Sequence, residues 1–222
     1  GNVAGYRAAF IDAADYIAKN KPKPAKRKSW FGSDKGDSAG DAGGKRDLKL
    51  DTLAGAIEGD IRVHIHCYRA DEMATMLDLA KEFGFKVAAF HHGVEAYKLA
   101  DRLAADGVCG ALWADWWGFK MEAFDGIPEN IALVDRPKNS CAIVHSDSPE
   151  GIQRLNQEAA KVMASARRAR MPEITPEHAI TWMTANAAKA LGIEGQTGTL
   201  EAGKMADVVV WNGNPFSSYA LA

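Results

Sequence analysis

Three residues with metal-binding side chains, His66, His92 and Asp147, each stand at the end of an apolar run. The runs read "IRVHIHC", "KVAAFHH" and "SCAIVHSD". Neutral imidazoles and a carboxylate are typical ligands of zinc and similar divalent ions, and three such ligands leave a position open for water. Taken singly, a histidine in an apolar strand more often packs in the interior, and an aspartate before Ser-Pro more often belongs to a turn. Their recurrence at matching positions favours a metal site.

These runs belong to a regular alternation of predicted strands and helices. This pattern is typical of βαβ units with a parallel sheet. In a parallel α/β barrel, the C-terminal strand ends and the loops after them build the active site. The three residues are therefore expected to meet at one mouth. The predicted strands are 61–67, 86–91, 108–113 and 140–146, and the predicted helices between and after them are 70–85, 94–107 and 149–169.

The chain is expected to divide into four parts. Helix 48–58 should end at Gly59, and a later helix should begin at Thr175 as N-cap and end before Gly192. The last part is expected to contain two short strands around a turn at Ala202–Gly203. The four parts are a helix that precedes the barrel units (1–20), a flexible low-complexity loop (21–47), the βα units (48–192) and the start of a small β-sandwich segment (193–222).

Composition is that of an ordinary globular chain, with 47% hydrophobic and 25% charged residues. The net charge of −2 gives no reason to expect nucleic acid as a partner. No apolar run reaches the roughly 18 residues of a membrane span, so a soluble protein is expected, with the cytoplasmic and the periplasmic or secreted compartments both open. The three cysteines, Cys67, Cys109 and Cys141, are expected to be buried thiols rather than a disulfide framework.

The sequence resembles the amidohydrolase superfamily of metal-dependent hydrolases, and most of all its imidazolonepropionase-like and metallo-dipeptidase members. The stretches that carry the resemblance are "VHIHCYRADEM", "FHHGVEAYKLADRLA", "AIVHSDSPEG" and "MTANAAKALGI" followed by "GTLEAGKMADVVVWNGNP". It runs from about Arg46 to Phe216. It implies an α/β fold that is the C-terminal half of a (β/α)8 TIM-type barrel, about strands five to eight, with the start of a small β-sandwich.

The resemblance also implies roles for the three residues. His66 matches the metal ligand that ends the fifth barrel strand, His92 before Gly93 matches the one that ends the sixth, and Asp147 matches the aspartate that ends the eighth. One or two divalent ions, with Zn²⁺ the ion that the resemblance implies, would activate a water. Asp147 would move protons between that water and the leaving nitrogen. The implied substrate is a small peptide-like or cyclic amide.

Two family elements are missing from the chain, the first-strand His-x-His pair and the fourth-strand Lys or Glu. An N-terminal barrel half, from the same polypeptide or a second chain, would have to supply them, and a homo-oligomer is also open. The 222-residue chain alone is therefore expected to be inactive and to bind metal weakly. The alternatives are a non-catalytic half-barrel scaffold and a deaminase or lyase on the same barrel.

Other polar residues near the predicted mouth receive weaker assignments. His64 and His145 precede predicted ligands by two residues, so they should share their face one layer deeper and support them. His91 alternates with His92 and is expected to face the surrounding helices. Tyr68 and Arg69 follow His66; Arg69 could bind a substrate carboxylate or pair with a neighbouring acid.

A tryptophan-rich loop follows the third predicted strand. Trp113, Trp116 and Trp117 either line a substrate pocket, a role assigned above all to Trp117, or pack under the loop. Asp115 and Lys120 lie in the same loop, and the sequence gives neither a role.

Overall fold

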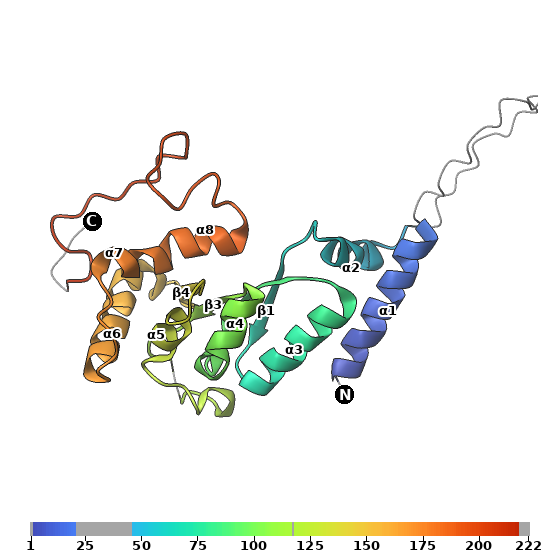
Figure 1. Ribbon diagram of the computed structural model, residues 1–222, viewed down its shortest axis with the longest axis horizontal. Coiled ribbons are helices and arrows are strands. Elements are labelled where there is room, and N and C mark those ends of the chain that lie inside the picture. The colour runs from blue at the N-terminus through green and yellow to red at the C-terminus, as the bar shows by residue number, and fades with distance from the viewer. Residues whose placement is uncertain (1, 21–45, 117, 218–222) are drawn as a thin grey trace, which may run out of the picture. The chain divides into compact units, whose positions relative to one another are not determined.

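The computed structural model describes residues 2–20, 46–116 and 118–217 (Figure 1). Its chain divides into two units, which are described separately. The expected loop 21–47 and Trp117 therefore lie outside the described residues, apart from positions 46 and 47. None of the helices that the structure describes is both long enough and apolar enough to cross a membrane.

The first unit comprises residues 1–61 and 79–86. It contains α1 (Asn2–Asn20), α2 (Leu48–Glu58) and the end of α3 (Ala70–Phe83). Helices α1 and α2 confirm the two helices expected on either side of the segment 21–47.

Local contacts explain this unit. The ring of Phe10 stacks on Phe83 and Phe85, with centroid distances of 5.4 and 4.5 Å, and so joins α1 to the end of α3. The side chain of Asp47 accepts hydrogen bonds from two backbone N–H groups of the first turn of α2. Gly59 ends α2 in the left-handed conformation (φ 87°), as the sequence predicts.

The second unit, residues 62–78 and 87–222, contains a four-stranded parallel sheet in the order β1-β2-β3-β4. This confirms the predicted parallel α/β fold. Sequential order is also that of successive strands in a barrel. A complete barrel has eight strands, so the half-barrel assignment stays a prediction. The strands are β1 (Val63–Cys67), β2 (Val87–His92), β3 (Cys109–Leu112) and β4 (Ala142–Val144).

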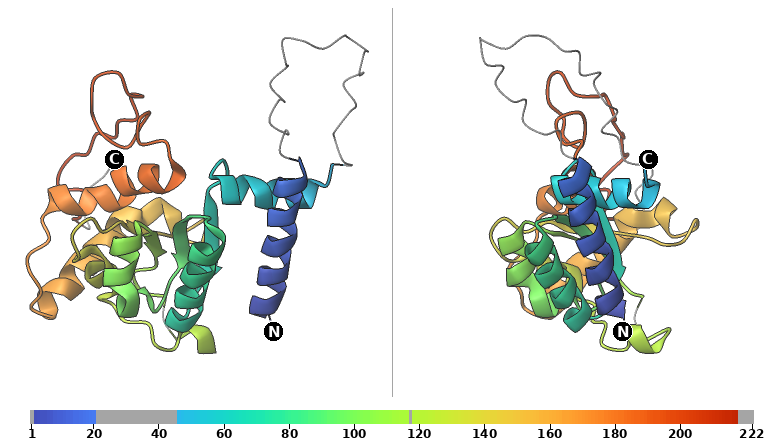
Figure 2. Two further views of the ribbon diagram at one scale, coloured as in Figure 1. Left: turned by 45° about the vertical axis from the view of Figure 1, so that its right-hand side comes forward. Right: turned by 90° about the vertical axis from the view of Figure 1, so that its right-hand side faces the viewer.

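Helices connect the strands and pack on the sheet (Figures 1 and 2). Both α4 and α5 contact β3, and Phe90 and Leu112 are fully buried. The face that carries Ala89, Cys109 and Ala111 instead packs against α8, through Ala190. The remaining helices are η1 (Ala96–Leu99), α4 (Ala100–Asp106), η2 (Met121–Ala123), α5 (Asn130–Asp135), η3 (Ile152–Arg154), α6 (Leu155–Arg168), α7 (Pro176–Ala179), η4 (Ile180–Met183) and α8 (Ala185–Leu191).

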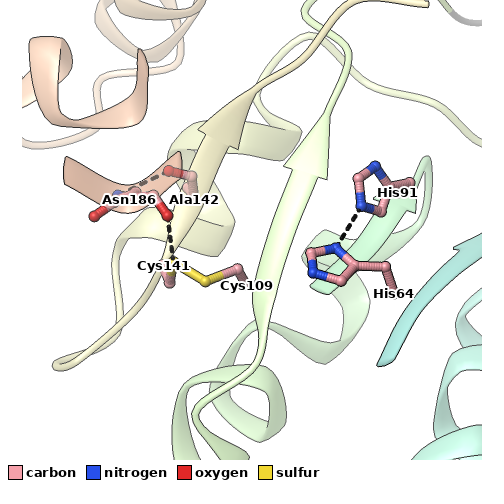
Figure 3. The surroundings of a disulfide bond; sticks show 6 residues. All are labelled: His64, His91, Cys109, Cys141, Ala142 and Asn186. Atoms are coloured by element: carbon pink, nitrogen blue, oxygen red, sulfur yellow. Dashed lines mark hydrogen bonds between the residues drawn. A yellow bond between two sulfur atoms is a disulfide. The ribbon is translucent and has the colours of Figure 1, made fainter. Parts of the chain in front are cut away.

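The expectation of three free thiols is wrong, because Cys109 and Cys141 form a disulfide (Figure 3). Gly110 pairs with Ala142 across β3 and β4, so the residues that precede them, Cys109 and Cys141, also lie side by side. The Cα–Cα distance of 4.5 Å allows the bond. Cys67 alone remains a buried free thiol, and burial, with the nearby Glu72 carboxylate, raises its pKa to about 11.

The segment after β4 departs from the prediction in two places. The helix expected from Thr175 to Gly192 has both predicted ends, but it is divided into α7, η4 and α8, and the backbone turns at Thr184 (φ −128°, ψ −88°). Within 193–217 the turn at Ala202–Gly203 forms, but the two expected strands do not. A strand needs a neighbour for its backbone hydrogen bonds, and no strand that the structure describes pairs with this segment.

Candidate active site

Histidines from three strands gather where the strands end. Nδ1 of His66 lies 2.6 Å from Nε2 of His92. On the other side of the same ring, Nδ1 of His92 lies 3.1 Å from Nε2 of His145. Both predicted histidine ligands are therefore brought together, and His145 contacts one of them directly.

His91 belongs to the same cluster, which corrects the expectation that it faces the helices. Across the parallel pair β1–β2, His66 stands beside His91, and residues side by side in register point to the same face. Nε2 of His91 lies 2.9 Å from Nδ1 of His64, and Figure 3 shows the two rings joined near the disulfide. His64 thus supports His91 rather than His66 directly.

The backbone of His92 explains how two consecutive histidines reach one cluster. Strand alternation alone would turn its side chain to the opposite face. His92 instead has φ 70°, in the left-handed region that few non-glycine residues adopt. Its ring consequently lies within hydrogen-bond distance of His66 and His145.

Three histidines of the cluster, His91, His92 and His145, have lowered pKa values and are therefore neutral at pH 7. Burial, reinforced by neighbouring imidazoles, lowers the pKa values of His91 and His145 to about 4. Burial also lowers the pKa of His92, although the Asp147 carboxylate opposes the shift. Neutral imidazole keeps a lone pair on one ring nitrogen, which is the form that binds a metal ion.

Asp147 lies near this cluster without joining it. It stands in the loop after β4, and its charge acts on His92 and His145. No hydrogen bond links it to either histidine in the part of the chain that the structure describes, where no three His, Cys, Asp or Glu side chains converge closely enough to hold one ion.

The donor set nevertheless has the chemistry of a divalent metal site. Two nitrogen ligands of one tetrahedral zinc ion stand roughly 3.3 Å apart. His66 and His92 are closer, at 2.6 Å, so their ring nitrogens share a hydrogen bond. An ion held between them would replace this hydrogen bond. The residue types of His66, His92 and Asp147 fit a divalent metal ion. Among the described residues, no third ligand converges with the two histidines.

Two buried polar residues that the sequence analysis missed hold the loops of the mouth. Glu95 accepts a hydrogen bond from the backbone N–H of Ala70 (2.9 Å), which ties the loop after β2 to the first residue of α3. Asn130 accepts from the backbone N–H of Tyr97 and donates to the carbonyl of Gly93, both at 2.9 Å. A polar residue within an apolar helix turn, as in "ENIALV", is the only sequence signal for Asn130.

Aromatic side chains form a wall beside His92. The ring of Trp113 lies 4.5 Å from that of His92, and the ring of Tyr68 stacks at 5.5 Å (centroid distances). Trp113 and Trp116 line a small cavity together with His92 and Asn130. Trp113 also packs on the rings of Trp116 and Phe119, with centroid distances of 5.0 and 5.5 Å. These two tryptophans therefore both border the cavity and pack under the loop, and Trp117 lies outside the described residues.

Three charged residues near the mouth, Asp115, Lys120 and Arg69, each have a different kind of partner. Asp115 pairs with Lys161 (2.6 Å). Lys120 instead lies over the ring of Tyr68, with Nζ 3.8 Å from the centroid. Nε of Arg69 donates to Asp71 at 3.0 Å, which is the ion-pair alternative for this arginine.

The known proteins whose sequences resemble this chain include amidohydrolases and imidazolonepropionases. The model of the amidohydrolase family matches residues 46–221. Amidohydrolase tasK of Hapsidospora irregularis is 30% identical over 175 residues, which are 76% of this chain and 17% of that protein. Imidazolonepropionase of Shewanella piezotolerans is 59% identical over 39 residues, which are 18% of this chain and 10% of that protein.

Solved structures show the same relationship. An amidohydrolase from Thermotoga maritima superimposes with a TM-score of 0.79 at 26% identity, over 99% of this chain and 52% of that one. An adenosine deaminase from Xanthomonas campestris, solved with bound zinc, has a TM-score of 0.51 at 20% identity, over 68% and 37% of the two chains, and shows the fold alone. The chain thus spans at most about half the length of these relatives. The family model covers most of the chain, which therefore belongs to the amidohydrolase family.

Proposed function

We propose that this chain carries part of the active site of a metal-dependent hydrolase that cleaves a C–N bond of a small peptide-like or cyclic amide. The observation that supports this most is the direct approach of His66 and His92, neighbours at the C-terminal ends of adjacent parallel strands. Family membership supports the same class of reaction.

The proposed metal ligands are His66, His92 and Asp147, with zinc the most suitable ion and one or two ions per site. When bound, the ion would supply a water ionised near neutral pH as the nucleophile. The lowered pKa of His92 keeps that imidazole neutral and available. The zinc in the similar adenosine deaminase structure is consistent with this choice, although that likeness concerns the fold.

The residues around the ligands would orient them and move protons. His145 approaches Nδ1 of His92 and so fixes which ring nitrogen of His92 faces His66. Asp147 would accept a proton from the attacking water and deliver it to the leaving nitrogen. Tyr68, stacked on His92, would border the substrate.

A complete site requires ligands that the four described strands do not provide. We propose that an N-terminal barrel half contributes them, from the same polypeptide or from a second chain. The Thermotoga protein supports this proposal, because this chain matches 52% of its length. The 222-residue chain alone is expected to be inactive.

Two chemical readouts test this function. The protein, combined with the segment that completes its barrel and loaded with zinc, is assayed for new amines from dipeptides and N-acyl amino acids. It is also assayed for ammonia from purine and pyrimidine amines. We expect amide cleavage that Asp147→Asn reduces by at least about 100-fold, the usual size of a general acid–base contribution. Ammonia release alone would assign a deaminase, and the absence of both activities would favour the scaffold.

A further inference from the structure

Among the residues that the structure describes, Lys120 at the mouth has no carboxylate partner, whereas the neighbouring lysines do. Lys98 pairs with Asp125 at 2.7 Å, and Lys161 pairs with Asp115 at 2.6 Å. The only contacts of the Lys120 ammonium in the described part of the chain are with aromatic rings, Tyr68 at 3.8 Å and Phe119 at 5.3 Å from the centroids. Two of the loop's acids are thus neutralised by other lysines, and this cation is left uncompensated.

The loop holds Lys120 in place. The backbone N–H of Gly118 donates to the carbonyl of Ala123 (2.9 Å), and that of Ala123 donates to the carbonyl of Lys120 (3.0 Å). Gly118 has φ 70°, a conformation that favours glycine. These bonds close the loop, and the Lys120 ammonium then lies over the face of Tyr68, where a cation is attracted to the ring.

A second unpaired donor lies beside the same metal-ligand candidate. Trp113 is 5% exposed, and its Nε1–H has no hydrogen-bond partner among the described residues. Buried N–H groups are nearly always paired, so such a donor needs an acceptor. Trp113 lines the cavity that also contains His92 and Trp116.

Together these groups describe a recognition surface for one kind of molecule. We propose that Lys120 binds a carboxylate of the substrate and that the indole N–H of Trp113 donates to an oxygen of the same molecule, whose apolar body lies on Tyr68 and Trp116. This inference rests on the proposed amide hydrolysis. It narrows the substrate class to N-acyl amino acids and similar anionic amides. Asp147, the other charge that acts on His92, is assigned to the metal.

Calorimetric titration of the 222-residue protein in EDTA tests the proposal, because chelation removes any metal–carboxylate bond. The probes are N-benzoylglycine and its uncharged amide, N-benzoylglycinamide. We expect the acid to bind about tenfold more tightly, the size of one charge-assisted hydrogen bond. Lys120→Met should abolish this preference, and Lys120→Arg should retain it. Trp113→Phe should weaken both ligands by a similar factor.

Lys138→Met is the matched control, since it removes the same charge from an exposed lysine in the α5–β4 connection, before β4 begins. It should leave the preference intact. Equal affinities for acid and amide, no binding of either, or an unchanged preference in Lys120→Met would overturn the proposal. Because neither metal nor turnover is needed, failure of the proposed hydrolysis would be seen separately, in the zinc-loaded assay.

Discussion

His66 and His92 meet across two adjacent parallel strands, with Nδ1 of the first 2.6 Å from Nε2 of the second. The distance is that of a hydrogen bond in which one ring nitrogen donates and the other accepts. The unusual φ of 70° at His92 makes the approach possible. This pair is the centre of the proposed site.

The histidine cluster should make the metal-free protein less stable in acid. The folded-state pKa values of His91 and His145, about 4, lie below the ordinary value of 6.5, so the unfolded chain binds more protons between these limits. Their contribution to stability is full above pH 6.5 and decreases as the pH falls toward 4. Urea unfolding in EDTA between pH 7.5 and 4.5 should show this decrease, with a smaller slope in His145→Gln. An identical slope in that variant would show that His145 titrates normally.

The Cys109–Cys141 disulfide should contribute substantially to the free energy of unfolding. It closes a loop with a sequence separation of 32 residues, for which chain entropy predicts about 4 kcal/mol. Urea unfolding with and without reductant measures the difference, and Cys67→Ala should respond to reductant as the natural sequence does. Thiol titration of the unfolded, unreduced protein should give one thiol; three would contradict the bond.

Asn130 should be a structural requirement of the mouth. Its amide joins the backbones of Gly93 and Tyr97. Asn130→Ala leaves the Tyr97 N–H without its acceptor, whereas the Gly93 carbonyl keeps only its hydrogen bond from the Ala96 N–H. We expect a loss of about 2 kcal/mol in the free energy of unfolding. Gln153→Ala removes an exposed side-chain amide that donates to the Pro149 carbonyl, and it should cost less than about 0.5 kcal/mol. Similar losses in the two variants would show that the buried bonds do not hold the loops.

Apolar runs and their spacing predicted the sheet well, because a strand buried by helices on one side must be apolar over a defined length. The four strands, the cap at Thr175 and the ends at Gly59 and Gly192 all follow from local sequence. These features depend on residues close together in the chain.

Features that depend on register or on a neighbour could not be predicted in the same way. The disulfide requires that Gly110 pair with Ala142, which no local pattern specifies. Uniform strand alternation places His91 on the face opposite to His92, and this prediction is wrong because the backbone at His92 leaves the extended region. The valines at 208–210 have the composition of a strand but are exposed and unpaired with any described strand. Composition alone does not supply a pairing partner.

The zinc affinity of the 222-residue protein, measured by competition with a chromophoric chelator at pH 7.5, tests whether His66 and His92 are metal ligands. We expect one weakly bound equivalent, with affinity reduced by about tenfold or more in His66→Asn and His92→Asn. The control His178→Asn changes an exposed histidine that contacts Asp135 and should bind zinc as the natural sequence does. Equal affinity in all four proteins would contradict the assignment of His66 and His92 as metal ligands.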